Sequence, residues 1–254
     1  MAIPKILVGD TGLIGRTLCD KIDFDLKFNS SNISFFDSTV EDGCDIYLSC
    51  LPAEKWKVNN NTLKDILNII QIFNYLQTKK YNNIYLFSTI DVYENITSGA
   101  DEELLPELRY FSYGNNRRFF EILVKDQLTY NKLKVIRLPG LYGKYLKKNI
   151  IFDYINNHQC ESINLNSTYQ WYNLVNLVDD LDKIKDEERE FYNFFPEPLS
   201  TKELFSALNA SEIGYEGSEV LYNYKTNTTE TGYWQDKDSV LRGVLEFVNQ
   251  NRNK

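Results

Sequence analysis

Short apolar runs alternate with stretches of helical periodicity along the first half of the chain. The runs predict β-strands at residues 5–9, 26–28, 45–51, 84–87 and 134–138, and the periodic stretches predict helices at 13–22, 61–79 and 113–130. Strands that alternate with helices require crossover connections, which give a mostly parallel sheet with helices on both faces. The pattern therefore predicts an α/β protein with a doubly wound parallel sheet.

The predicted helix at 61–79 is the longest of these elements. Five apolar side chains recur along it at helical spacing: Leu63, Ile66, Leu67, Ile70 and Phe73. An amphipathic helix of a globular protein turns its apolar face toward the core. We therefore expect these five side chains to be buried against the sheet.

Composition and charge narrow the classes of protein that fit this pattern. Hydrophobic residues make up 43% of the 254 residues and charged residues 25%, which is typical of a folded protein with a sizeable core. The formal net charge of −8 argues against nucleic acid as the main partner. No stretch approaches the ~20 apolar residues that span a bilayer. The first strand follows Met1 too closely for a signal peptide, so we expect a cytoplasmic protein with no membrane partner.

The four cysteines, Cys19, Cys44, Cys50 and Cys160, show no Cys-x-x-Cys spacing. Such a set is typical of reduced thiols in a cytosolic chain, and it argues against a disulfide scaffold or a zinc site. We expect no bound metal.

The strongest chemical signal lies where the first predicted strand meets the first predicted helix. Residues 9–15 read Gly-Asp-Thr-Gly-Leu-Ile-Gly, directly after an apolar run. Glycines at this turn let the backbone approach a pyrophosphate, and the next helix directs its positive N-terminal end at that anion. The motif favours a Rossmann-like dinucleotide site over a glycine-rich turn without a ligand.

Two further stretches carry reactive side chains. Tyr113, Arg117 and Glu121 recur every four residues, so they share one face of the predicted helix. A cation one turn from a tyrosine favours the phenolate and lowers the tyrosine pKa, which suits proton transfer coupled to hydride transfer. Thr89 and Asp91 follow a predicted strand, where a hydroxyl group can bind a substrate oxygen. The alternatives are a solvated helix face and a polar turn.

Four motifs follow one another in a fixed order along residues 5–145. They are Gly9-Asp10-Thr11-Gly12-Leu13-Ile14-Gly15, Ser88-Thr89-Ile90-Asp91-Val92-Tyr93, the stretch 113–121, and Arg137-Leu138-Pro139-Gly140-Leu141-Tyr142-Gly143. In this order they resemble the extended short-chain dehydrogenases/reductases, which are NAD(P)-dependent sugar-nucleotide epimerases, dehydratases and reductases. The resemblance is weak beyond residue 145.

This resemblance implies roles for single residues. Tyr113 matches the acid/base tyrosine of the family and Thr89 matches its Ser/Thr. Arg117 stands where the family has a lysine that contacts the nicotinamide ribose, and its planar fork is larger and differently directed than an ammonium group. Asp91 is a second acid/base, a sugar contact or a solvated turn residue. Ile90 replaces the first acid of the Thr-Asp-Glu of 4,6-dehydratases, which argues against that dehydration.

The predicted site follows from the motifs and the resemblance together. Tyr113, Thr89 and Arg117 are the predicted catalytic residues, and Thr89, Asp91 and Tyr113 the predicted substrate contacts. The predicted cofactor contacts are Gly9, Thr11, Gly12, Leu13, Ile14, Gly15, Asn29, Ser30, Cys50, Leu51, Tyr113, Arg117 and Pro139. The cofactor is NADP or NAD. The second strand ends at Asn29-Ser30 without an acid and with Lys27 near, which favours NADP slightly.

The organisation and function follow from the same reading. Residues 1–144 are expected to form a Rossmann core that binds a dinucleotide. Residues 145–254, with helices predicted near 148–157, 200–208 and 238–249, are expected to form a smaller substrate-binding lobe with segments returning to the core. We expect an NAD(P)-dependent oxidoreductase or epimerase of nucleotide-activated sugars, in carbohydrate biosynthesis. The alternative is a catalytically lapsed NAD(P)-binding regulatory or scaffolding protein. Homodimer formation stays open.

Overall fold

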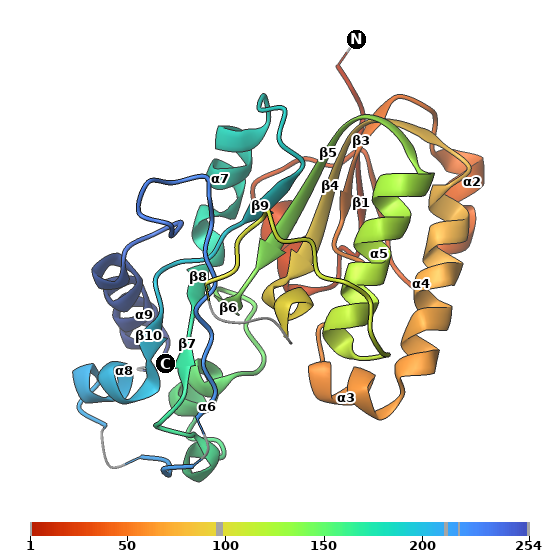
Figure 1. The fold of residues 1–254 in the computed structure, drawn as a ribbon. Helices are drawn as coiled ribbons and strands as arrows, with labels where there is room; N and C mark the ends of the chain where they lie inside the picture. Colours follow the sequence, from red (N-terminus) through yellow and green to blue (C-terminus); the bar gives the residue numbers. More distant parts are fainter. Residues whose placement is uncertain (1, 95–98, 211–212, 218, 253–254) are drawn as a thin grey trace. The chain divides into compact units, whose positions relative to one another are not determined.

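The computed structural model describes residues 2–94, 99–210, 213–217 and 219–252 (Figure 1). The chain forms two compact units. The first contains residues 1–96, 105–137 and 178–192, and the second contains residues 97–104, 138–177 and 193–254. The second segment of the first unit thus ends at residue 137, before the expected boundary at 144, and residues 178–192 form its third segment.

A six-stranded sheet with strand order β2-β1-β3-β4-β5-β9 forms the core of the first unit. Its strands are β1 (Lys5–Val8), β2 (Leu26–Phe28), β3 (Cys44–Leu48), β4 (Lys80–Thr89), β5 (Thr129–Leu138) and β9 (Phe191–Asn193). Strand β1 pairs in parallel with β2 and β3, and β3 pairs in parallel with β4. The α/β class with a doubly wound parallel sheet is therefore confirmed.

Helices lie on both faces of this sheet. They are α1 (Leu13–Cys19), α2 (Phe36–Thr39), α3 (Lys55–Asn60), α4 (Thr62–Leu76), α5 (Tyr113–Gln127) and α7 (Leu177–Ile184), with 3-10 turns at Ile33–Phe35 and Ile90–Tyr93. Figure 1 shows α4 and α5 side by side. Their buried residues share one core with Ile46, Ile84 and Val135. On the other face Tyr47 stacks on Tyr85, with ring centres 4.5 Å apart.

The buried face of α4 is not the predicted one. Three of the five residues expected to be buried are 62%, 67% and 40% exposed: Leu63, Leu67 and Ile70. The buried stripe runs through Asp65, Ile69, Ile72, Phe73 and Leu76. Both sets of residues have helical spacing, so periodicity alone does not determine which face is buried. The buried face contains Asp65, which forms an ion pair with Arg117.

The second unit contains short strands and three longer helical segments. Strand β6 (Gly140–Tyr142) pairs with β8 (Trp171–Asn173), and β7 (Thr168–Tyr169) pairs with β10 (Leu199–Ser200). The helices are α6 (Ile150–Asn156), α8 (Thr201–Ala207) and α9 (Lys237–Arg252), with 3-10 turns at Cys160–Ser162 and Leu174–Asn176. All three helices were predicted. Within the described ranges, no helix of either unit has the length and apolar character needed to cross a bilayer.

Candidate functional site

The glycine motif forms the turn between β1 and α1, as its position in the sequence predicts. Gly9 has a φ of +101°, and a Cβ atom there would lie 2.3 Å from the carbonyl oxygen of Ser49. A Cβ atom on Gly15 would lie 2.0 Å from the carbonyl oxygen of Gly9. Gly12 is the N-cap residue of α1 and offers no side-chain cap, which leaves amide groups of the first turn to a partner outside the helix. This backbone cradle fits a pyrophosphate.

The other predicted cofactor contacts of the first unit lie at the ends of strands adjacent to β1. Asn29 and Ser30 follow β2, and Cys50 and Leu51 follow β3. The Asn29 amide donates to a carboxylate oxygen of Asp10 at 3.0 Å, so an acid does lie at the end of β2. Burial raises the pKa of the Cys50 thiol to about 12, which keeps this thiol protonated at neutral pH. Pro139 belongs to the second unit, and its cofactor contact stays a prediction.

The three predicted catalytic residues lie together at the N-terminal end of α5. The Ser112 hydroxyl accepts a hydrogen bond from the amide of Asn115, which caps the helix and places Tyr113 in its first turn. The guanidinium carbon of Arg117 lies 4.5 Å from the centre of the Tyr113 ring. The first turn of α5 packs against the turn that follows Thr89, since a Cβ atom on Gly114 would lie 1.9 Å from the carbonyl oxygen of Asp91. Arg117 and the Thr89 hydroxyl both act to lower the pKa of Tyr113. Residues far apart in the sequence thus surround Tyr113.

The electrostatics of Tyr113 differ from the expectation for a tyrosine with a cation one turn away. Burial is the largest effect, and it raises the Tyr113 pKa above its ordinary value. Arg117 and the Thr89 hydroxyl lower this pKa, whereas the negative charge of Asp91 raises it. The expectation was therefore right for the effect of Arg117 but wrong for the net direction.

Arg117 is engaged by an acid that we did not predict. Its Nη1 atom lies 2.7 Å from Oδ2 of Asp65, and its Nη2 atom lies 3.3 Å from Oδ1 of the same carboxylate. Nη2 also donates to the carbonyl oxygen of Pro52 at 2.6 Å. Both side chains are buried, being 5% and 3% exposed. The planar fork of an arginine makes all three contacts at once, which a single ammonium group does not reproduce.

We expect Arg117→Lys to lower the free energy of unfolding by about 1–3 kcal/mol, because an Asp65 oxygen or the Pro52 carbonyl then loses its donor inside the protein. Urea unfolding measures this change, and Arg242→Lys on the exposed side of α9 serves as the control. Turnover by Arg117→Lys is expected to fall as well. Unchanged stability with retained or raised turnover would show that a lysine satisfies the site.

Asp91 also has an ionic partner that we did not predict. It lies in the 3-10 turn Ile90–Tyr93, where its amide donates to the Thr89 hydroxyl at 3.2 Å. The Nζ atom of Lys55, the first residue of α3, lies 2.6 Å from Oδ1 of Asp91. Oδ2 lies 3.3 Å from the Thr89 hydroxyl oxygen. Asp91, Thr89 and Lys55 therefore form one hydrogen-bonded group.

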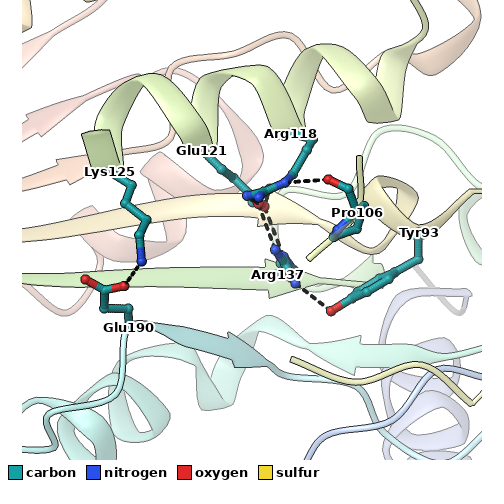
Figure 2. A network of polar contacts seen from close by, with 8 residues as sticks. Tyr93, Pro106, Arg118, Glu121, Lys125, Arg137 and Glu190 are labelled. Carbon is teal, nitrogen blue, oxygen red and sulfur yellow. Dashed lines mark hydrogen bonds and ion pairs between the residues drawn. The ribbon is translucent and has the colours of Figure 1, made fainter. Parts of the chain in front are cut away.

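Glu121, the third residue of the predicted helix face, belongs to a separate buried network (Figure 2). Its carboxylate accepts from Nη2 of Arg137 at 2.8 Å, from Nη1 of Arg118 at 3.0 Å and from the Ser88 hydroxyl at 2.6 Å. Arg137 also donates to the hydroxyl of Tyr93. Burial would raise the Glu121 pKa, but the two arginines hold it below its ordinary value. The network fixes Ser88, and with it the end of β4 that carries Thr89.

Comparisons with known proteins place the fold. No protein-family model matches the sequence, and no curated protein matches it. Among solved structures, MoeE5 in complex with UDP-glucose and NAD is 14% identical, with a TM-score of 0.74 over 98% of this chain and 99% of that one. The dTDP-4-dehydrorhamnose reductase of Bacillus anthracis, solved with NADP, is 17% identical, with a TM-score of 0.73 over 98% and 99%. A UDP-N-acetylglucosamine 4-epimerase of Methanobrevibacter ruminantium is 12% identical, with a TM-score of 0.73 over 98% of each chain. The chain therefore has the fold of the extended short-chain dehydrogenases/reductases, the family that its motifs resemble.

Proposed function

We propose that this protein is an NAD(P)-dependent oxidoreductase or epimerase of nucleotide-activated sugars. The observation that carries the proposal is the position of Tyr113, which lies against the Arg117 guanidinium at the point where α5 packs on the turn after Thr89. The glycine turn lies close to this group, because Gly9 packs against Cys50 and the charge of Arg117 acts on the Cys50 thiol. Solved proteins of the same fold are named as epimerases and reductases of nucleotide sugars and hold NAD or NADP, which supports the assignment.

Each residue then has a role that its surroundings allow. The backbone at Gly9, Gly12 and the first turn of α1 would hold the pyrophosphate of the dinucleotide. A bound nicotinamide ring would supply the position that accepts or donates a hydride. Tyr113 removes the proton of the sugar hydroxyl group or returns it, and Thr89 holds that oxygen. Arg117 keeps a positive charge beside the phenolate.

Two features give opposite indications about the choice between NAD and NADP. The uncharged pair Asn29-Ser30 does not repel the 2′-phosphate of NADP, which is the basis of our prediction of NADP. The Asp10 carboxylate, held by the Asn29 amide at 3.0 Å, would repel that phosphate and favour NAD. The two affinities, measured side by side, decide between these indications.

The proposal is tested by titration calorimetry with NAD and NADP, followed by a panel of UDP-, GDP-, CDP- and dTDP-sugars. We expect binding of a dinucleotide, binding of at least one nucleotide sugar, and turnover of that sugar. Dinucleotide binding without any nucleotide-sugar binding would favour the alternative, a lapsed regulatory or scaffolding protein, for which the engagement of Arg117 by Asp65 is the supporting observation. Binding of neither dinucleotide would remove both functions.

Two further expectations stay proposals. We place the protein in the cytoplasm, since all four cysteines are free thiols, as is usual in a reducing compartment. Homodimer formation also stays a prediction. Sedimentation velocity of the purified chain measures it directly.

A further inference from the structure

Thr89 has one hydroxyl proton and two neighbours that can accept it. A hydroxyl group donates only one hydrogen bond at a time. Oδ2 of Asp91 lies 3.3 Å from the Thr89 oxygen, and the Thr89 hydroxyl also acts on Tyr113, whose pKa it lowers. A carboxylate is the stronger acceptor of the two. Unless something weakens it, Asp91 therefore takes the proton that the reacting oxygen needs.

The distances show which contact of Asp91 is the strong one. Hydrogen bonds between a hydroxyl and a carboxylate are commonly about 2.5–2.7 Å long, so a contact of 3.3 Å between Thr89 and Asp91 is weak. The contact between Lys55 and Asp91 is 2.6 Å, as short as a charge-assisted pair becomes. Asp91 is only 13% exposed at its side chain, whereas Lys55 is 42% exposed. The carboxylate thus bonds to Lys55 and only loosely to Thr89.

We propose that Lys55 is a positioning residue of this site: it holds the Asp91 carboxylate on its own ammonium group and so leaves the Thr89 proton available to the reacting oxygen and to Tyr113. The proposal rests on the proposed function and extends it. Lys55 acts through Asp91, with which it pairs at 2.6 Å.

The charges around Tyr113 agree with such a role. Arg117 lies one turn along α5 and is paired with Asp65 of α4, while Asp91 of the 3-10 turn is paired with Lys55 of α3. The Thr89 hydroxyl, which also acts on the Tyr113 pKa, carries no charge at neutral pH. Tyr113 therefore lies between two ion pairs. Removal of Lys55 would take away a positive charge 2.6 Å from Asp91, whose own charge raises the Tyr113 pKa.

Lys55→Gln tests the proposal, with Lys57→Gln as the matched control. Lys57 lies on the same short helix and pairs with Glu54 at 2.8 Å. The side chain of Lys57 is 54% exposed. For Lys55→Gln we expect kcat to fall roughly tenfold with KM changed by less than about twofold, and the pH midpoint that depends on Tyr113 to move upward. Lys57→Gln should behave as the parent. A rise in KM at unchanged kcat would overturn the proposal, because it would place Lys55 on the substrate.

The double variant Lys55→Gln, Asp91→Ala separates an indirect effect from a direct one. If Lys55 acts through Asp91, the double variant loses no more activity than Asp91→Ala alone. Full additivity of the two losses would overturn the proposal.

A crystal structure of Lys55→Gln gives a readout that needs no activity. The distance between the Thr89 oxygen and Oδ2 of Asp91, now 3.3 Å, is expected to shorten toward ~2.6 Å. An unchanged distance would contradict the proposal. If the parent protein bound no dinucleotide or nucleotide sugar, the proposed function would fail, and this distance would still decide the role of Lys55.

Discussion

Tyr113→Phe is expected to lower turnover of a nucleotide sugar by about 10²- to 10⁴-fold while dinucleotide binding stays within about twofold of the parent. The substitution removes one oxygen atom, which is the atom whose pKa the Thr89 hydroxyl and Arg117 both act on. The ring remains, so its stacking at 4.5 Å on the Arg117 guanidinium is kept. The loss therefore reports proton transfer and not the packing of α5.

Steady-state kinetics and calorimetry of the same preparation measure the two quantities. Tyr110→Phe is the control, because this tyrosine lies three positions away and is 54% exposed. It should turn over substrate like the parent. Tyr113→Phe with near-parental turnover would exclude an acid/base role for Tyr113.

The pH dependence gives a second readout of the same oxygen. Because burial raises the Tyr113 pKa, the phenolate becomes more populated only as the pH rises toward that value. A step in which Tyr113 accepts a proton should thus accelerate with increasing pH, and a step in which it donates one should slow down. Tyr113→Phe is expected to abolish this dependence of the rate on pH, whether the rate of the parent rises or falls with pH.

The parts of the site that the sequence predicted are local. The glycine turn depends on residues within one strand–turn–helix segment, and Tyr113 and Arg117 depend on the spacing within one helix. Thr89 and Asp91 were likewise predicted from a local feature, their place at the end of β4 and in the turn that follows it. Such features follow from short-range geometry, so a motif and its place between strand and helix were enough to find them.

The parts that were missed depend on contacts between distant segments. Asp65 and Arg117 are 52 residues apart, and Lys55 and Asp91 are 36 residues apart. An acid within an amphipathic helix is usually solvated, so we had no reason to expect a buried Asp65. The same contact accounts for the wrong face of α4, since a helix that turns Asp65 toward Arg117 turns Leu63 and Leu67 outward.

Glu121→Gln is expected to lower the free energy of unfolding by about 3–5 kcal/mol, the largest stability effect that the described contacts predict. The substitution leaves the Arg137 guanidinium, which is 0% exposed at its side chain, without a negative partner. A glutamine amide keeps the size of the side chain and can still accept one hydrogen bond, so the loss reports charge. Urea unfolding at neutral pH measures it. Glu188→Gln, an exposed glutamate paired with Lys132, is the control and should leave stability unchanged.

The pH dependence of unfolding tests the same interaction with a definite sign. Arg137 and Arg118 lower the Glu121 pKa in the folded protein below its value in the unfolded chain. The stabilisation is therefore fully present above the unfolded value of about 4.3, and it is lost as the pH falls through the lower, folded value. Glu121→Gln, which cannot ionise, should show a correspondingly weaker loss of stability in acid. An equal acid dependence in parent and variant would mean that the ion pair in Figure 2 contributes no net stability. In that case the end of β4, and with it Thr89, is held by the pairing of β4 with β3 and by its other hydrogen bonds, and not by this ion pair.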